Sequence, residues 1–210
     1  MNETELQDVV YEFTTTSDSQ KMIELLGVII TYYLTVYKSE RQKFADTNHI
    51  DLNDYGQDIL LTNYAEYLET LFLGLRDRSL EKLEELESNL EDNINLLMTA
   101  FVMNQFRRTH ETESSNVIQT AQVGVIEQLQ ASNTDMRVTK TWISRNDERT
   151  CEICRALHGM TIPVQENFLV NGQVVDLKDG TRFVYNYVDR TVAIVHPYDR
   201  CRIEFNIERD

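Results

Sequence analysis

The stretches TWISRNDERTCEICRALHG (141–159) and AIVHPYDRC (193–201) decide how the last third of this chain folds. The first holds two cysteines in a C-x2-C pair, and the second holds a histidine and the third and last cysteine. Two thiolates at this spacing can bind one metal ion from a single turn, and a distant histidine and cysteine complete a tetrahedral set that suits zinc. The predicted zinc ligands are Cys151, Cys154, His196 and Cys201.

Other interpretations of these residues stay open. Three reduced thiols and a core histidine can lie near each other by chance. A C-x2-C pair can also be a redox pair, but the thioredoxin type lies in a βαβ unit and no such alternation is visible here. His158 and Asp199 are alternative ligands, because imidazole and carboxylate groups also bind zinc. Four protein ligands leave no open coordination position, so the predicted site is structural rather than catalytic.

The same two stretches resemble the phage head morphogenesis, or minor head, proteins of the Mu F-like family. Members carry a Trp, then a D-x-R/T-C-x-x-C-x-x-L-x-G run, then a closing H-P-x-C-R-C. The matching residues are Trp142, Asp147, Arg149, Thr150, Cys151, Cys154, Leu157, Gly159, His196, Pro197, Arg200 and Cys201. Asp199 takes the place of the first cysteine of the closing motif, and His158 stands where an acidic residue commonly precedes the glycine. The resemblance covers about the last third of the chain.

This resemblance implies a minor head protein of a tailed phage or prophage. It further implies binding to the portal and/or the major capsid protein at the inner capsid, during procapsid assembly and DNA packaging or ejection. The implied location is the virion head interior, and the host cytoplasm during assembly. The alternatives are a toxin-like or Cys-His enzyme module and a zinc-bearing nucleic-acid-binding protein. No spare segment houses a toxin-like domain, and nothing marks an oxyanion hole or a third orienting residue, so we expect no enzyme.

The charge and hydropathy of the chain limit the kinds of partner that it is expected to bind. Almost all of the net charge of −15 lies in residues 1–134. An acidic region repels phosphate backbones, which argues against direct nonspecific nucleic-acid binding and suits a basic surface on a protein partner. The most apolar run, residues 22–37, is short for a bilayer span and contains Glu24, so no membrane partner is expected. Three cysteines argue against a disulfide framework and fit a reducing cytosol.

The absence of proline before residue 163 and apolar residues at helical spacing predict an elongated helical domain at 1–134. Its predicted helices cover 4–13, from Ser17 or Asp18 to about 44, about 54–76, from about 79 to at least 101, and 115–130. The fourth carries heptad-like leucine spacing from Leu80 to Phe101 and an acidic opposite face, which we interpret as a solvated surface.

After the polar segment 132–135 the pattern changes to strand formers. We predict a small β-rich, zinc-stabilised domain at 135–210, which makes the fold class α+β. The expected elements are a strand at 138–143, a helical turn at 152–157, a hairpin at Asn171–Gly172, a turn at 178–180, a strand at 182–188 and a last strand at 191–195 that delivers His196. The core of such a small domain is modest, so a structural metal would add to its stability.

Overall fold

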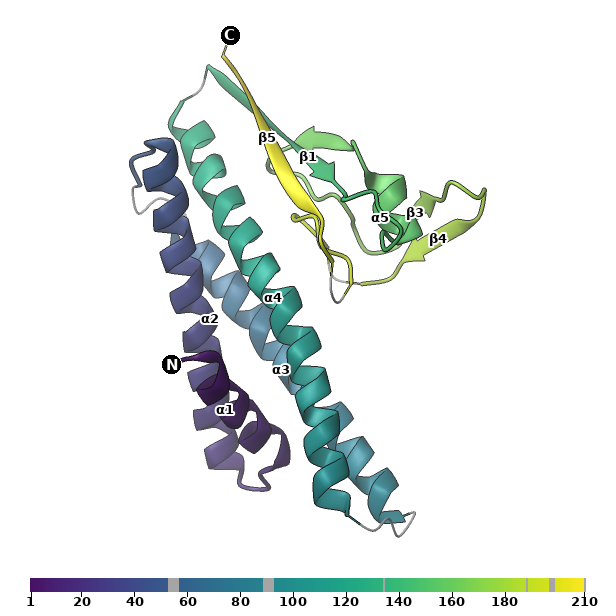
Figure 1. Ribbon diagram of the computed structural model, residues 1–210. Coiled ribbons are helices and arrows are strands. Elements are labelled where there is room, and N and C mark those ends of the chain that lie inside the picture. The colour runs from purple at the N-terminus through teal and green to yellow at the C-terminus, as the bar shows by residue number, and fades with distance from the viewer. Residues whose placement is uncertain (53–56, 89–92, 134, 188, 197–198, 210) are drawn as a thin grey trace. The chain divides into compact units, whose positions relative to one another are not determined.

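The structure is a computed structural model that describes residues 1–52, 57–88, 93–133, 135–187, 189–196 and 199–209. Its α+β fold begins with long helices and continues into a small antiparallel sheet region (Figure 1). The elements are α1 Glu3–Thr15, α2 Ser19–Asn48, α3 Gln57–Ser88, α4 Ile94–Ser132, β1 Met136–Ile143, α5 Glu152–Leu157, β2 Thr161–Pro163, β3 Gln173–Asp176, β4 Arg182–Tyr185 and β5 Arg202–Arg209.

The chain divides into two compact units. The first, the helical unit, contains Met1–Val36 and Gly56–Glu111, and the second, the mixed unit, contains Tyr37–Tyr55 and Thr112–Asp210. The division falls within α2 and α4, so each of these helices contributes residues to both units. The predicted boundary between 134 and 135 coincides with the change from helix to strand, and independent folding of the two sides stays a prediction.

Polar side chains fix the starts of the first two helices. Asn2 and Glu5 form a capping box on α1, in which the Asn2 side chain accepts from the Glu5 N–H at 3.0 Å and the Asn2 N–H donates to the Glu5 carboxylate at 2.8 Å. Asp18 accepts from the N–H groups of Gln20 and Lys21 at 2.9 and 3.1 Å. The predicted cap at Ser17 or Asp18 is therefore confirmed as Asp18.

The predicted breaks in the later helices are wrong. Ser79 does not start a helix, because α3 continues through it to Ser88, and its buried hydroxyl donates to the Leu75 carbonyl at 2.9 Å. In the same way α4 continues from Ile94 to Ser132, where a break before 115 was predicted, and the helix predicted from about 79 to at least 101 is divided between α3, which ends at Ser88, and α4. Neither junction contains a glycine or proline to stop the helix. The expected helix start at Asp54 and the acidic residue Glu91 lie outside the described residues.

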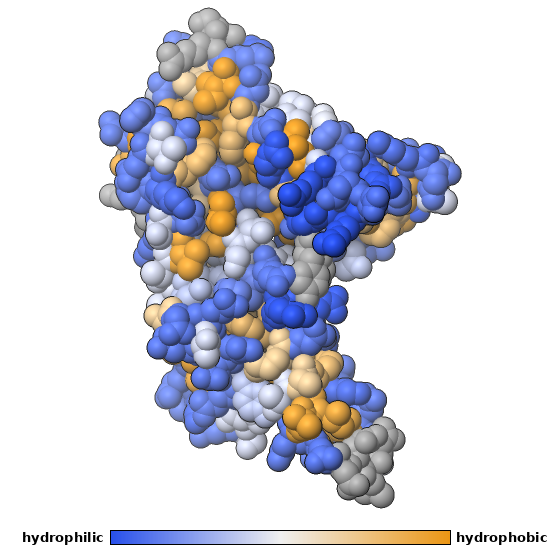
Figure 2. Space-filling model, in the orientation of Figure 1, coloured by the Kyte–Doolittle hydropathy of each residue, from blue (hydrophilic) through white to orange (hydrophobic). Residues whose placement is uncertain are grey.

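The helical unit is held together by large apolar side chains at helical spacing. Side chains from all four helices are almost completely buried; among them are Leu6, Phe13, Ile29, Tyr33, Leu68, Phe72, Leu75, Val102 and Phe106. The predicted acidic face is exposed at Glu81, Glu84, Glu85 and Glu87. Leu96 and Leu97, near the end where α3 and α4 meet, are 68% and 39% exposed, and the space-filling view shows apolar residues there among hydrophilic ones (Figure 2).

The mixed unit is built on a three-stranded antiparallel sheet with β1 in the centre. The strand order is β2-β1-β5, and β5 pairs with β1 along its whole length, from Met136 opposite Arg209 to Ile143 opposite Arg202 (Figure 1). Alternate residues of β1, from Met136 to Trp142, are buried on one face. The strands β3 and β4 form a separate two-stranded hairpin.

Several strand predictions need correction. Residues 191–195 form no strand; instead β5 follows the closing motif, and neither β5 nor the three-residue β2 was predicted. The predicted turn at Lys178–Gly180 closes the hairpin of β3 and β4, with Gly180 at φ 84°, whereas Asn171–Gly172 forms a turn that joins no two strands. The strand predicted at 182–188 ends at Tyr185, and Val188 lies outside the described residues. Whether these residues form strands depends on pairing with residues distant in the sequence, and a local sequence pattern does not reveal such pairing.

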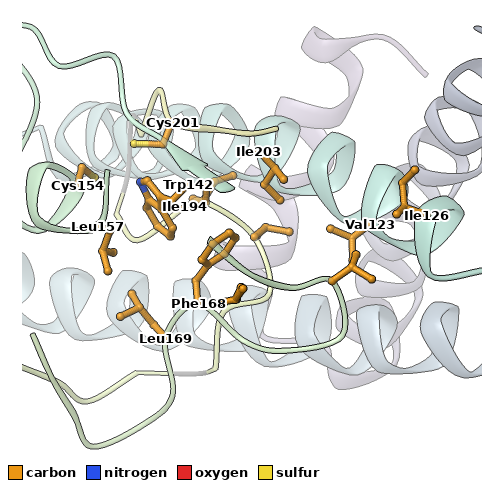
Figure 3. Packing of buried hydrophobic residues seen from close by; sticks show 14 of the residues in the cluster. Val123, Ile126, Trp142, Cys154, Leu157, Phe168, Leu169, Ile194, Cys201 and Ile203 are labelled. Carbon is orange, nitrogen blue, oxygen red and sulfur yellow. The ribbon is translucent and has the colours of Figure 1, made fainter. Parts of the chain in front are cut away.

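The core of the mixed unit joins the sheet to the C-terminal half of α4. Val123 and Ile126 of α4 belong to the same buried cluster as Trp142, which is 0% exposed and packs edge-to-face on Phe168 with ring centroids 5.3 Å apart (Figure 3). Among the described residues, none of the helices has the length and hydrophobicity that crossing a membrane requires.

Candidate metal centre

The loop that leads into α5 presents the C-x2-C pair. The Asp147 carboxylate accepts from the Arg149 N–H and the Thr150 hydroxyl, each at 3.1 Å, so this residue organises the turn. Cys151 is the N-cap of α5, and its sulfur accepts from the Cys154 N–H at 3.3 Å. The turn therefore brings both sulfurs to the same end of one short helix.

A loop between Ala193 and Cys201 presents the other half. Gln119 of α4 fixes both ends of it, because its amide accepts from the Ala193 N–H and donates to the Cys201 carbonyl, each at 3.0 Å. Asp199 braces the interior, accepting from the N–H groups of Val195 and Cys201 at 3.0 and 2.9 Å. His196 is thus delivered by a hydrogen-bonded loop rather than by a strand. Pro197 lies outside the described residues.

An ion pair ties the two loops together. Both guanidinium nitrogens of Arg200 donate to the two carboxylate oxygens of Asp147, each at 2.7 Å. The hydrogen bond from Arg200 is the largest cause that lowers the pKa of Asp147 to about 2, and the Thr150 hydroxyl adds to it. A bidentate Arg–carboxylate pair fixes orientation as well as distance, so it sets the separation of the two loops.

The donor atoms of the two loops converge. The His196 Nε2 lies 3.1 Å from the Cys151 Sγ and 3.7 Å from the Cys154 Sγ. The Asp199 Oδ2 lies 3.4 Å from the Cys154 Sγ and 4.0 Å from the His196 Nε2. Two groups of three donors result, which share Cys154: an outer group with Cys151 and His196, and a buried inner group with Asp199 and Cys201.

Within each group of three donors the distances resemble those of a tetrahedral zinc site. Zinc bonds of about 2.3 Å to sulfur and about 2.0 Å to nitrogen or oxygen place neighbouring ligand atoms roughly 3.3–3.8 Å apart. The four separations, 3.1 to 4.0 Å, span that range, but the described donors form two groups of three and not one group of four, so a bound ion would draw the two groups together. The donors line a small cavity of about 20 Å³, which has room for one small species. A zinc ion here would crosslink the two loops and add no chemistry of its own if all four positions are protein ligands.

Trp142 belongs to the buried hydrophobic cluster that also contains Cys154 and Cys201. Its Nε1 is buried without a hydrogen-bond partner among the described atoms. Figure 3 shows this nitrogen on the side of the ring that faces the end of the core where Cys154 and Cys201 lie.

The thiols have unequal acidity. The contact with Cys154 is the largest cause that lowers the pKa of Cys151 well below its usual value, and His196 contributes in the same direction. The same contact, the Cys201 thiol, burial and the Asp199 carboxylate raise the pKa of Cys154. All three cysteines are free. A metal ion bound by both sulfurs would therefore have to displace a proton.

The structure brings together the predicted residues Cys151, Cys154 and His196, and it places Cys201 beside Cys154. His158 lies apart from them: it is exposed, and its Nδ1 accepts from the Ser144 N–H at 3.1 Å. Sequence reasoning missed Gln119, because one polar residue on a helix carries no signal of a distant partner. Asp199 was noticed as a departure from the closing motif, and that departure marks a residue of the centre.

The comparisons with known proteins agree with the motif. The family model described as Phage Mu protein F like protein matches residues 81–203, more than half of the chain. The match begins within α3 and includes all of α4, so it extends well beyond the last third that the motifs cover. No curated protein and no solved structure matches this chain. The chain belongs to the Phage Mu protein F-like family.

Proposed function

We propose that this protein is a minor head protein that acts in phage head morphogenesis. It binds the portal and/or the major capsid protein at the inner face of the head while the procapsid assembles, and it influences DNA packaging or ejection. Its places of action are the host cytoplasm during assembly and the virion head interior afterwards. The observation that supports this function is the family match, which spans both loops of the candidate metal centre.

The proposed mode of action is binding rather than catalysis. The exposed side chains Glu84, Glu85 and Glu87 suit a basic surface on the partner, and the nearby Leu96 adds apolar area, since it is 68% exposed. Charged surfaces speed encounter and select partners, while apolar contacts supply affinity. Complex formation should therefore weaken as salt rises.

Each of the two predicted domains has its own role in this proposal. Residues 1–134 serve as the assembly arm, and residues 135–210 carry the family motif and a structural zinc at the cluster of cysteines and His196. Cys201, the predicted fourth ligand, and Asp199 compete for the last position. Limited proteolysis should cut near 132–135, and circular dichroism of fragment 1–134 should show mainly helix. A fragment spectrum dominated by strand would contradict this arrangement.

Deletion of the gene followed by proteomics of purified heads tests the function. We expect heads without the protein to be defective in assembly, packaging or ejection, and wild-type heads to contain it in few copies. Normal infectious particles without the protein, together with its absence from wild-type virions, would exclude the proposal. The partner is identified by capture of the portal or major capsid protein at low and high salt.

Charge reversal tests the acidic surface. The triple variant Glu84→Lys, Glu85→Lys and Glu87→Lys should reduce capture of the partner and incorporation into heads. A matched control reverses three exposed acidic residues elsewhere: Glu24→Lys, Glu66→Lys and Glu69→Lys. Equal losses in both variants would assign the effect to net charge, and no loss in either would leave the acidic face as a solvated surface.

A Cys-His enzyme is the second candidate, favoured by the 3.1 Å separation of the Cys151 Sγ and the His196 Nε2. A nucleophile–base pair needs this contact. Alkylation distinguishes the two functions. A zinc-bound Cys151 should resist iodoacetamide until a chelator is added, whereas an enzyme nucleophile should react at once in the protein as purified.

A further inference from the structure

The Asp199 carboxylate is buried in the protein. Its side chain is 1% exposed, and its two oxygens accept from the N–H groups of Val195 and Cys201. The His196 Nε2, 4.0 Å from its Oδ2, forms an ion pair with it only when the imidazole is protonated, and Arg200 pairs with Asp147 instead. Burying a carboxylate is costly unless a cation or several hydrogen bonds compensate it.

The Oδ2 atom of Asp199 also faces the other donors. It lies 3.4 Å from the Cys154 Sγ and 4.0 Å from the His196 Nε2, while these two atoms are 3.7 Å apart. The three atoms therefore form a triangle with sides close to the roughly 3.3–3.8 Å edges of a tetrahedral zinc site. The Cys151 Sγ lies 3.1 Å from the same His196 nitrogen, but Cys151 and Asp199 belong to different donor groups, so an ion bound by all four residues would draw these two closer together.

The Cys201 sulfur does not belong to the outer donor group of Cys151, Cys154 and His196. It is grouped with Cys154 and Asp199 instead. The Cys201 backbone is held at both ends, since its N–H donates to Asp199 and its carbonyl accepts from Gln119. A shift of this sulfur towards His196 would disturb those hydrogen bonds, whereas the Oδ2 of Asp199, a member of the same inner group, already lies 4.0 Å from the His196 Nε2.

We propose that this chain binds zinc through Cys151, Cys154, His196 and the Asp199 carboxylate, with Cys201 as a buried thiol beside the site. The Val195 N–H then orients the ligating oxygen of Asp199, because it donates a hydrogen bond to that atom. A set of two sulfurs, one nitrogen and one oxygen is harder than a set with three sulfurs. It should therefore favour zinc over cadmium more strongly than a three-cysteine site does.

Cobalt(II) is the probe for the test, because thiolate-to-cobalt charge-transfer absorption grows with the number of bound sulfurs. Full-length protein is stripped of metal and titrated with cobalt, and zinc affinity is measured by competition with a chelator. We expect wild type to give the absorption of two thiolates, and Cys201→Ser to keep both that absorption and the affinity. Asp199→Asn, which retains the shape of the side chain, should lose at least about tenfold in affinity.

Asp199→Cys is the gain-of-signal variant. It should raise the charge-transfer absorption by about half, because it adds a third sulfur to two, and it should shift the preference from zinc towards cadmium. Cys201→Ala accompanies Cys201→Ser in case a buried hydroxyl prevents folding. Circular dichroism of every variant, recorded without metal, separates a loss of binding from a loss of fold.

The outcomes are distinct. The proposal is overturned if Cys201→Ser or Cys201→Ala removes about a third of the absorption and weakens binding, while Asp199→Asn binds like wild type. It is also overturned if the wild-type protein binds neither cobalt nor zinc. Neither result bears on the role in head assembly, which concerns partner binding and is tested by deletion.

Discussion

The helical unit and the mixed unit are stabilised over different distances along the sequence. In the helical unit, Phe72 and Leu75 of α3 are buried three residues apart, so the core side of the helix can be recognised in a short stretch. In the mixed unit, Cys151 contacts His196, which lies 45 residues later in the chain, and β1 pairs with β5, which begins only at Arg202. The helical unit therefore depends on local periodicity, whereas the mixed unit depends on a few distant contacts that one change can break.

The largest expected effect comes from Cys154, the one residue shared by both donor groups. Cys154→Ser should abolish zinc binding and lower the unfolding temperature of the mixed unit by about 10 °C or more, which corresponds to roughly 3–5 kcal/mol in a chain of this size. The helical unit should keep its hydrogen-exchange protection. Thermal unfolding and hydrogen exchange with mass spectrometry measure the two effects.

A chelator provides the control for this variant. Metal removal should destabilise the wild-type protein and leave Cys154→Ser unchanged, because both act through the same ion. His158→Gln is the matched histidine control, since His158 lies outside the cluster, and it should bind zinc like wild type, unlike His196→Gln. Equal destabilisation of Cys154→Ser and wild type by the chelator would show that the ion is bound elsewhere.

Two core substitutions test whether the units unfold separately. Trp142→Ala and Phe72→Ala each remove a 0% exposed aromatic side chain, one from each unit, and each should cost about 3–5 kcal/mol. Trp142→Ala should increase exchange in the sheet and α5, and Phe72→Ala in the helical unit. If either variant opens both units to the same extent, the chain unfolds as a single cooperative body and the contrast between the regions is wrong.

The same contrast explains what the sequence could predict. The α+β class, the helix α2, the strand β1 and three converging donors were predictable because periodicity and the spacing of two motifs are local. The strand β5 was not, since its pairing with β1 is set by partners about 65 residues away in the chain. Lys140 was equally unpredictable: it is 0% exposed at a core position of β1, its ammonium lies 5.3 Å from the Phe168 ring centroid, and burial lowers its pKa to about 8.

A smaller effect is expected from His110 in the helical unit. It stacks on Phe106, its Nδ1 contacts the Tyr33 hydroxyl at 2.9 Å, and burial lowers its pKa below the ordinary value of 6.5. Because the unfolded chain binds the proton more tightly, stability should fall as the pH drops below about 6.5. Urea unfolding between pH 7.5 and 5.5 should show this loss in wild type and a smaller one in His110→Gln. The exposed His49→Asn should behave like wild type, and an unchanged slope in His110→Gln would exclude His110 as the cause.

The smallest effect on stability is expected from the pair of Asp147 and Arg200, which is partly exposed, although it joins the two loops of the metal centre. Because the pKa of Asp147 is lowered from 3.8 to about 2, its stabilising contribution is complete above about pH 4 and is lost as the pH falls towards 2. The difference in unfolding midpoint between wild type and Asp147→Asn, both measured with chelator, should therefore shrink across that window. Asp176→Asn, which breaks an exposed pair in the hairpin, is the control and should have no measurable effect.

At neutral pH, Asp147→Asn should weaken zinc binding by up to about tenfold, because the pair orients the loops rather than the ion. A zinc affinity equal to that of wild type would mean that hydrogen bonds from Gln119 and Asp199 set the loop positions without it.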